Sequence, residues 1–168
     1  MIVDEYFKAI WPKNSETTMS SADKPVPKGM PFSSAAFGGL GVIPFAVGAL
    51  LANIVETAAT GQWLIIGYGA VILSFLGGIQ WGVGLAVSPR AWLPYSVAII
   101  ISLAGWIAML LPPLWGLALL AAGFIAAFVY DAISAGVFRL PGWFIGLRSL
   151  LTVCVVGCLA LAALPLIP

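Results

Sequence analysis

The sequence predicts an all-α polytopic membrane protein: a bundle of five transmembrane helices preceded by an amphipathic helix at the membrane surface. Three observations lead to this fold class. Of the 168 residues, 62% are hydrophobic and only 8% are charged, whereas soluble domains carry roughly 25% charged residues. The apolar residues gather in five stretches of about the ~20 residues that cross a bilayer as a helix. These stretches are too long, and alternate too little, for barrel strands.

The same composition excludes several classes of function. A net charge of +1 provides no basic surface for nucleic acid. The absence of His removes the commonest metal ligand and the usual general base. Cys154 and Cys158 share one helix face in an apolar run, so we expect packing thiols rather than a disulfide or a metal site. We therefore expect no metal and no cofactor, and a non-enzymatic role is favoured.

Residues 1–11 are predicted to form the amphipathic surface helix. Their apolar side chains follow the i, i+1, i+4, i+5 spacing of one helix face, which includes Phe7 and Trp11. These two would anchor the helix at the level of the lipid headgroups. Docking onto a partner protein would give the same pattern. Residues 12–33 are a polar linker rich in Lys, Pro and Ser, which we expect to be extended unless a partner holds it.

The five-helix transmembrane domain is expected to occupy residues 34–168. Its predicted spans are residues 34–55, 63–87, 93–111, 114–130 and 144–164. Pro112 and Pro113 alone separate the third span from the fourth. Because proline suits the first turn of a helix and disfavours helix in the residue before it, this pair predicts a tight helical hairpin.

The basic residues predict the orientation of the bundle. With five spans, one side of the membrane receives the N-terminus, the second loop and the fourth loop. All seven basic residues fall on that side: Lys8, Lys13, Lys24, Lys28, Arg90, Arg139 and the membrane-proximal Arg148. The positive-inside rule then places the N-terminus in the cytoplasm and the C-terminus in the periplasm of a bacterial inner membrane.

Small residues are dense in the second span. Gly77 and Gly78 are adjacent, and Gly78 and Gly82 form a GxxxG pattern that lets two helix backbones approach closely. Packing inside the bundle is the favoured interpretation. The alternatives are a contact face for a partner subunit and a broken helix at a transport site.

Few polar residues lie at membrane depth, where they are costly and often functional. Gln80 lies in the second span, Asp131 ends the fourth, and Arg148 lies one turn inside the fifth. Asp131 and Arg148 flank one loop, so we expect them to pair, or both to reach Gln80. Such a pair would act as a staple that fixes helix register. The alternative, a proton relay, is disfavoured because a relay normally needs a series of titratable groups.

The segment 68–82, YGAVILSFLGGIQWG, resembles the signature of an uncharacterised five-span bacterial inner-membrane family whose eukaryotic relative is mitochondrial transmembrane protein 69. Ile43-Pro44-Phe45, the Leu111-Pro112-Pro113 turn, Tyr130-Asp131 and the residues from Trp143 to Thr152 are also similar. The family pattern carries His where this chain has Gln80, and Gln can form a hydrogen bond between helices but cannot titrate. A haem-ligating or proton-transfer role at that position is therefore in doubt.

The resemblance implies a fold but no reaction. Its spread between bacterial and mitochondrial inner membranes favours a non-catalytic accessory subunit or assembly factor, associated with a respiratory or photosynthetic complex. The expected partners are membrane lipids and other membrane-protein subunits. Two alternatives stay open. One is a small transporter or channel subunit, and the other is a quinone- or lipid-binding protein with a lateral pocket beside Trp81.

Overall fold

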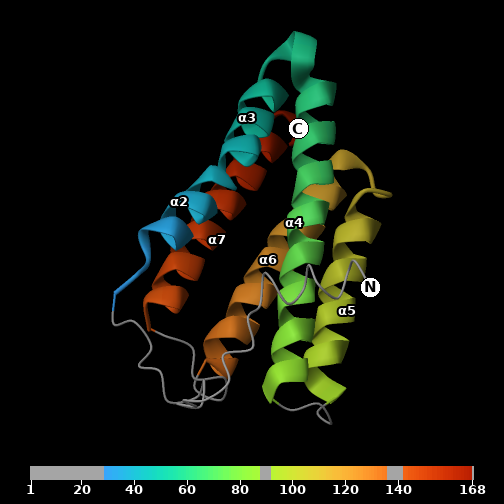
Figure 1. Ribbon diagram of the computed structural model, residues 1–168. Helices are drawn as coiled ribbons and strands as arrows, with labels where there is room; N and C mark the ends of the chain where they lie inside the picture. The colour runs from blue at the N-terminus through green and yellow to red at the C-terminus, as the bar shows by residue number, and fades with distance from the viewer. Residues whose placement is uncertain (1–28, 88–91, 136–141, 168) are drawn as a thin grey trace, which may run out of the picture.

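The computed structural model describes residues 29–87, 92–135 and 142–167, and every regular element in these ranges is a helix (Figure 1). The predicted surface helix at residues 1–11, with Phe7 and Trp11, lies outside the described residues, as does most of the predicted linker. The α-helices are α2 (Phe32–Leu40), α3 (Ile43–Ala52), α4 (Ala58–Val87), α5 (Trp92–Ala108), α6 (Pro113–Ser134) and α7 (Gly142–Ala163). Two short 3-10 helices, η1 (Val55–Thr57) and η2 (Leu164–Leu166), complete the order.

Four helical stretches in the described residues are long and apolar enough to cross a membrane. They are Phe32–Ala52, Val55–Leu85, Pro113–Ser134 and Gly142–Leu166. The remaining helix, α5, is apolar but has only 17 residues, about 26 Å at a rise of ~1.5 Å per residue. The protein is therefore an all-helical membrane protein with four candidate spans and a shorter fifth helix.

The first predicted span is broken rather than continuous. The helix axis changes direction between α2 and α3 at Gly41 and Val42, just before Pro44 in the first turn of α3. Proline cannot donate the amide hydrogen bond that would continue α2 into α3. The hydroxyl of Tyr68 on α4 instead donates to the carbonyl oxygen of Gly41 (3.1 Å). A side chain from a neighbouring helix thus satisfies a carbonyl at the break, as buried backbone in a membrane requires.

The predicted hairpin between the third and fourth spans is present in the structure. Pro112 is the N-cap of α6 and Pro113 its first residue. The chain leaves α5 through the amides of Met109 and Leu110, which bond to carbonyls three residues back. These tight turns end α5 at Ala108, three residues before the predicted end, and leave it short.

Two other boundaries differ from the sequence prediction by four residues or more. Helix α4 begins at Ala58 rather than at residue 63, directly after η1. The hydroxyl of Thr57 there donates to the carbonyl of Leu51 near the end of α3 (3.0 Å), which also accepts the amide of Ile54. Helix α6 continues to Ser134, whose hydroxyl bonds to the carbonyl of Tyr130 (2.6 Å), so Asp131 lies inside a helix and not at its end.

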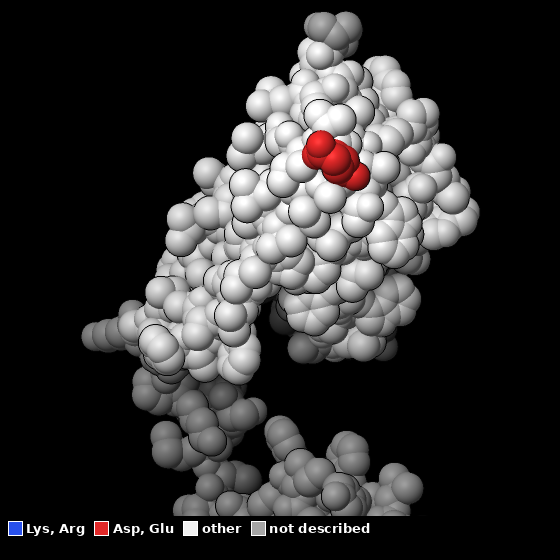
Figure 2. Space-filling view, turned by 90° about the horizontal axis from the view of Figure 1, so that it is seen from above, with Lys and Arg blue, Asp and Glu red and all other residues white. Residues whose placement is uncertain are grey.

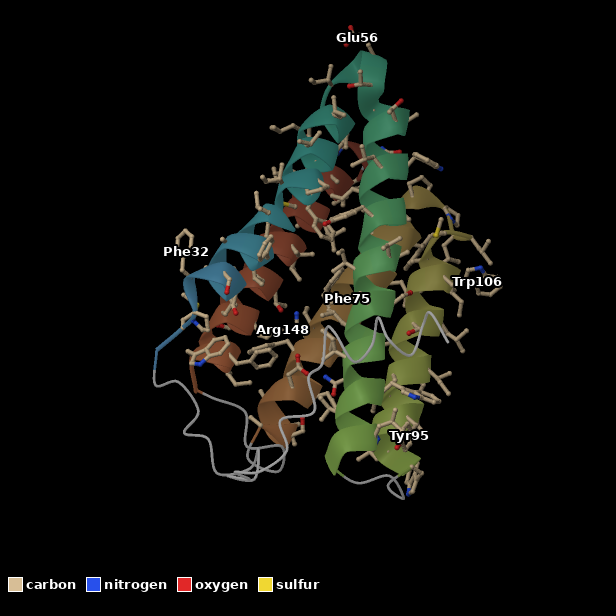
Figure 3. The ribbon with its side chains drawn as sticks, viewed as in Figure 1. Phe32, Glu56, Phe75, Tyr95, Trp106 and Arg148 are labelled. Atoms are coloured by element: carbon tan, nitrogen blue, oxygen red, sulfur yellow. The ribbon has the colours of Figure 1, made fainter. Side chains whose placement is uncertain are left out.

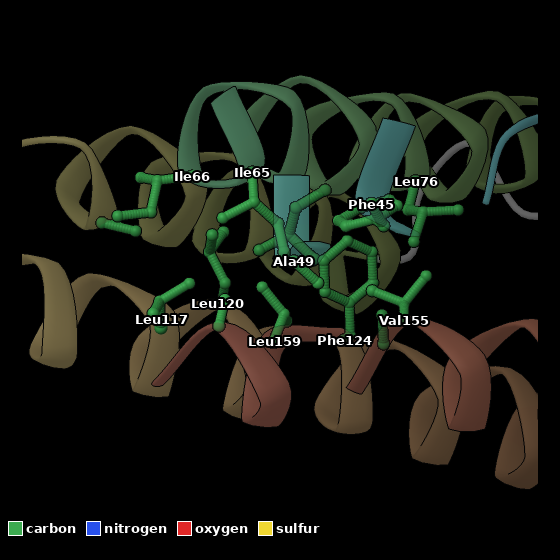
Figure 4. Packing of buried hydrophobic residues seen from close by; sticks show 14 of the residues in the cluster. Phe45, Ala49, Ile65, Ile66, Leu76, Leu117, Leu120, Phe124, Val155 and Leu159 are labelled. Atoms are coloured by element: carbon green, nitrogen blue, oxygen red, sulfur yellow. The ribbon is translucent and has the colours of Figure 1, made fainter. Parts of the chain in front are cut away.

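The core lies where α3, α4, α6 and α7 meet (Figure 4). The edge of the Phe45 ring meets the rings of Tyr68 and Phe124, with ring centroids 5.0 and 5.8 Å apart. Away from this centre, most large apolar side chains are exposed, as expected of a surface that faces lipid. The largest fully buried side chains are Phe45, Phe124, Ile65, Leu73, Leu117, Leu120 and Leu159.

Charge is nearly absent from the described surface. Of the described residues, only Glu56, Asp131 and Arg148 carry a charge, and Asp131 is buried. Glu56 is exposed at the end of the molecule where η1 joins α4. Viewed from above, that end shows a single acidic group on an otherwise uncharged face (Figure 2).

Candidate functional site

Three helices bring Gln80, Asp131 and Arg148 together in one buried polar cluster. Gln80 comes from α4, Asp131 from α6 and Arg148 from α7. Gln80 is 5% exposed and Asp131 is 4% exposed, and the Arg148 side chain is 11% exposed. Polar groups at this depth need partners, because an unpaired one costs several kcal/mol in an apolar medium.

Asp131 is the centre of this polar cluster. The side-chain amide of Gln80 donates to one carboxylate oxygen, Oδ1, in a very short hydrogen bond. The Nε of Arg148 donates to the other oxygen, Oδ2, at 2.8 Å, which also makes the two residues an ion pair. Each carboxylate oxygen therefore has its own donor. Asp131 joins α6 to α4 and α7 at the same time.

The polar cluster resembles a staple more than a catalytic device. Its two charges neutralise each other, and its amide cannot titrate. Among the residues that the structure describes, the one other carboxylate, Glu56, lies at the opposite end of the molecule (Figure 3). The same ranges contain no group of three His, Cys, Asp or Glu side chains that could hold a metal ion. Cys154 and Cys158 are both free thiols.

A cavity of about 180 Å³ adjoins the polar cluster on the side of Arg148. It lies below the break between α2 and α3, where α2 runs toward α7 and away from α4 (Figure 1). Phe75 of α4 and Arg148 of α7 both reach the space between these helices (Figure 3). The lining side chains are otherwise almost entirely apolar and come from α2, α3, α4, α6 and α7.

Two buried polar atoms on residues that line this cavity lack a partner among the described residues. They are Nη2 of Arg148 and the hydroxyl of Thr152, one helical turn further along α7. Thr152 is 6% exposed, and both residues line the cavity. Buried donors of this kind are uncommon and call for an explanation.

The glycines of the second predicted span lie in two different environments. Gly77 is buried against α5, and a Cβ at this position would lie 2.6 Å from the carbonyl oxygen of Ala98. A Cβ at Gly78 or Gly82 would meet no atom within 4 Å. Both face outward, together with Ser74 one turn earlier. The GxxxG pattern is therefore an open surface stripe, and the close approach of α4 to α5 depends on its neighbour Gly77.

Trp81 lies away from the Arg148 cavity. Its ring packs edge-on against Tyr95 of α5, with centroids 4.9 Å apart. It lines a separate, shallow hollow of about 300 Å³ between α4 and α5, together with Gly78 and Ser102. The hollow beside Trp81 and the cavity beside Arg148 therefore have no lining residue in common.

Sequence reasoning did not single out three of the side chains that shape this region. Tyr68 donates a hydrogen bond to the Gly41 carbonyl at the helix break, and Thr152 lines the cavity. Asn53, the C-cap residue of α3, donates its side-chain amide to the carbonyls of Ala49 (2.9 Å) and Leu161 (3.0 Å) and so connects α3 to α7. The position near a predicted helix end was the available signal for Asn53, but its hydrogen-bond partners could not be predicted from the sequence.

Comparison with known proteins covers all the α-helices that form this site. A family model described as Protein of unknown function (DUF3429) matches residues 30–164. The chain belongs to this family. Transmembrane protein 69 of Xenopus tropicalis is 32% identical over a match of 138 residues, and this match covers 77% of this chain and 53% of the relative. The chain thus spans about half the length of that relative. No solved structure matches it.

The DUF3429 assignment confirms the family resemblance expected from the sequence. The matched region contains the Asp131 polar cluster, the cavity beside it and the open glycine stripe of α4. Residues 1–29 lie outside the match. The family's description names no reaction and no ligand, so function must be argued from the geometry of these three features.

Proposed function

We propose that this DUF3429 protein is a non-catalytic accessory subunit or assembly factor of a larger energy-transducing complex in the bacterial inner membrane. It would bind another membrane protein through the outward face of α4. The observation that carries this proposal is the stripe of Ser74, Gly78 and Gly82 on that face. Both glycines of the stripe have open space beside them, and small residues at this spacing are typical of helix contacts in membranes.

The environment of the stripe supports a helical partner. A shallow hollow of about 300 Å³ between α4 and α5 includes Ser74, Gly78 and Trp81 in its wall. The small residues would let a partner backbone approach closely, and the exposed Trp81 would pack beside it. Dispersion contacts of this kind drive helix association in lipid, where the hydrophobic effect contributes little.

The buried polar groups favour a scaffold over a transporter. Gln80, Asp131 and Arg148 bind one another, and the core on the other side of this polar cluster consists of large apolar side chains such as Leu120 and Leu159. A transport path needs polar groups or a water-filled route through the bilayer, and the described core offers neither along its length.

Co-purification tests the proposal. The full chain carrying an affinity tag is expressed in its source bacterium, extracted in a mild detergent and analysed by mass spectrometry. We expect subunits of one larger membrane complex to co-purify in fixed proportion. Gly78→Ile combined with Gly82→Ile should reduce that recovery at least tenfold, because the bulky side chains separate the two backbones.

Gly157→Ile on α7 is the matched control, because a Cβ there also meets no atom within 4 Å. Its recovery should equal that of the wild type. Isolation of the wild-type chain as a free monomer, under conditions that keep other membrane complexes intact, would overturn the proposal. Equal loss of partners in the α4 and α7 variants would also count against α4 as the contact face.

A further inference from the structure

The cavity beside Arg148 is built by the backbone as well as by side chains. The break at Gly41 turns α2 away from α4, and Tyr68 holds the broken end in place through the Gly41 carbonyl. Gly38 and Gly41 line the resulting space. A continuous helix from Phe32 to Ala52 would run along α4, as α3 does, and would fill much of it. The cavity is therefore a consequence of the proline break and its hydrogen bond.

Two residues that line this cavity carry donors without a partner among the described residues, and such donors favour a ligand that has a hydrogen-bond acceptor. Thr152 is 6% exposed, and its hydroxyl has no partner among the described residues. Nη2 of Arg148 also has no hydrogen-bond partner among them. Both residues are on α7, one turn apart, and both line the cavity. An oxygen acceptor placed between them would satisfy both donors, which otherwise bear the cost of lost hydration.

The charge balance favours a neutral acceptor over an anion. Arg148 already neutralises Asp131 through the 2.8 Å ion pair, and no other described residue at this cavity is charged. A carboxylate or phosphate bound here would leave one uncompensated negative charge in an apolar site, which is costly. A carbonyl oxygen accepts the same two hydrogen bonds without that penalty.

The walls and the volume indicate the shape of the occupant. Four phenylalanine rings line the cavity: Phe37, Phe45, Phe75 and Phe124. Rings of this kind favour a flat conjugated partner, stacked or edge-on. An engineered apolar cavity of about 150 Å³ is known to hold benzene. A cavity of about 180 Å³ therefore has room for a carbonyl-bearing head of one ring, with little left over.

The mouth of the cavity faces the surface that lipid would cover. Phe37 on α2 and Phe75 on α4 line the cavity, and these residues are 74% and 64% exposed. These two rings come from the helices that diverge below the break (Figure 1). A ligand would enter between them from the bilayer, and an apolar tail would leave by the same route.

We propose that this cavity is a binding site for a membrane quinone. The quinone ring lies among the four phenylalanines, and one carbonyl accepts hydrogen bonds from Thr152 and Arg148. The isoprenoid tail passes between Phe37 and Phe75 into the lipid. This inference concerns binding alone, and it does not depend on the accessory role proposed for α4, because the two features involve different residues of that helix.

The test uses the purified full chain in lipid nanodiscs and three probes with an alkyl tail of nine or ten carbons. The probes are a decyl-substituted benzoquinone, decylbenzene and decanoic acid. Binding is measured by the shift in thermal unfolding temperature and by native mass spectrometry. We expect one benzoquinone per chain, bound at least tenfold more tightly than either of the other probes. Equal affinity for decylbenzene, or tighter binding of decanoic acid, would overturn the proposal.

Two variants locate the site. Thr152→Val keeps the shape of the side chain and removes the hydroxyl, so it should weaken benzoquinone about three- to tenfold, in line with one lost hydrogen bond. It should leave decylbenzene unchanged. Ser149→Ala is its control, because that hydroxyl bonds to the carbonyl of Gly146 (2.9 Å) and does not line the cavity. An unchanged affinity in Thr152→Val would contradict the proposed contact.

A second pair tests the cavity without touching the polar cluster. Gly38→Val adds bulk at the cavity wall and should abolish benzoquinone binding, because a Cβ there lies 3.1 Å from the mobile end of Leu151, another lining residue. Its neighbour Gly39 has no atom within 4 Å of an added Cβ. Gly39→Val should therefore bind benzoquinone as the wild type does. Binding that survives in Gly38→Val would overturn the assignment of this cavity.

Discussion

Asp131 has two donors from two different helices, and this geometry decides what the residue can do. The carboxylate accepts one hydrogen bond from Gln80 and one from Arg148, so each of its oxygens already has a donor. We therefore expect Asp131 to fix α6 against α4 and α7, as a polar contact that sets helix register does in an apolar bundle.

Breaking this ion pair from one side should be costly. Arg148→Met leaves the Asp131 carboxylate with one donor in an apolar site, and we expect a loss of about 2–4 kcal/mol in unfolding free energy. Asp131→Asn should cost a similar amount, because it strands the guanidinium. The double variant removes both charges together and should lose clearly less than the sum of the two single losses. Denaturant titration in detergent micelles measures all three.

Glu56→Gln is the control for these charge changes. Glu56 is exposed at the opposite end of the molecule, so neutralising it should change stability by less than about 0.5 kcal/mol. Single losses that simply add in the double variant would show that Asp131 and Arg148 are not coupled, and the staple would then be wrong.

The polar cluster shows what the sequence could and could not predict at this scale. Asp131 and Arg148 flank one short loop, so antiparallel helices had to bring them to similar depth, and their opposite charges suggested a pair. Thr152 gave no such signal, because a threonine in an apolar helix usually bonds to its own backbone. Only the structure shows that its hydroxyl lacks a partner and that residues from five helices line the cavity beside it. The same is true of Tyr68, whose acceptor lies 27 residues earlier in the chain.

At the scale of the helices, hydropathy predicted where the apolar segments lie but not how they bend or end. The break between α2 and α3 interrupts a run that is apolar throughout, so no change in polarity marks it. Pro44 was the local signal, but proline inside a membrane helix produces a kink only when the freed carbonyls find partners. That condition depends on α4 and is a tertiary property. The early end of α5 likewise depends on turn geometry before Pro112.

The packing of α4 against α5 gives a prediction at the same scale. A methyl group at Gly77 would lie 2.6 Å from the Ala98 carbonyl and closer still to the Ser102 hydroxyl, so the helices must separate. Gly77→Ala should therefore lower the unfolding free energy by about 1–3 kcal/mol. The measurement is thermal unfolding of the purified protein in detergent, followed by circular dichroism.

The adjacent glycine is the matched control for this substitution. A Cβ at Gly78 meets no atom within 4 Å, so Gly78→Ala adds the same methyl group to open space one residue along the helix. Its stability should stay within about 0.5 kcal/mol of the wild type. If the two variants were equally stable, the close contact between α4 and α5 at Gly77 would be contradicted.

At the scale of the whole molecule, the number of spans decides which sides the termini occupy. Four stretches have the length to cross a membrane, and α5 has 17 residues, about 26 Å against a hydrocarbon core of ~30 Å. A mismatch of a few ångströms costs only fractions of a kcal/mol per ångström. Leaving the apolar α5 out of the bilayer would cost far more. The helix also begins at the end where α4 finishes and runs back to the start of α6 (Figure 1). We therefore expect five crossings.

Five crossings place the two termini on opposite sides of the membrane, whereas four would place them on the same side. All seven basic residues then fall on the N-terminal side, so the positive-inside rule predicts a cytoplasmic N-terminus and a periplasmic Pro168. Alkaline phosphatase fused after Pro168 should be active, because it folds only outside the cytoplasm, and green fluorescent protein fused there should be dark. Green fluorescent protein fused before Met1 should fluoresce. Fluorescence from both ends would contradict the fifth crossing, and phosphatase activity from an N-terminal fusion would reverse the orientation.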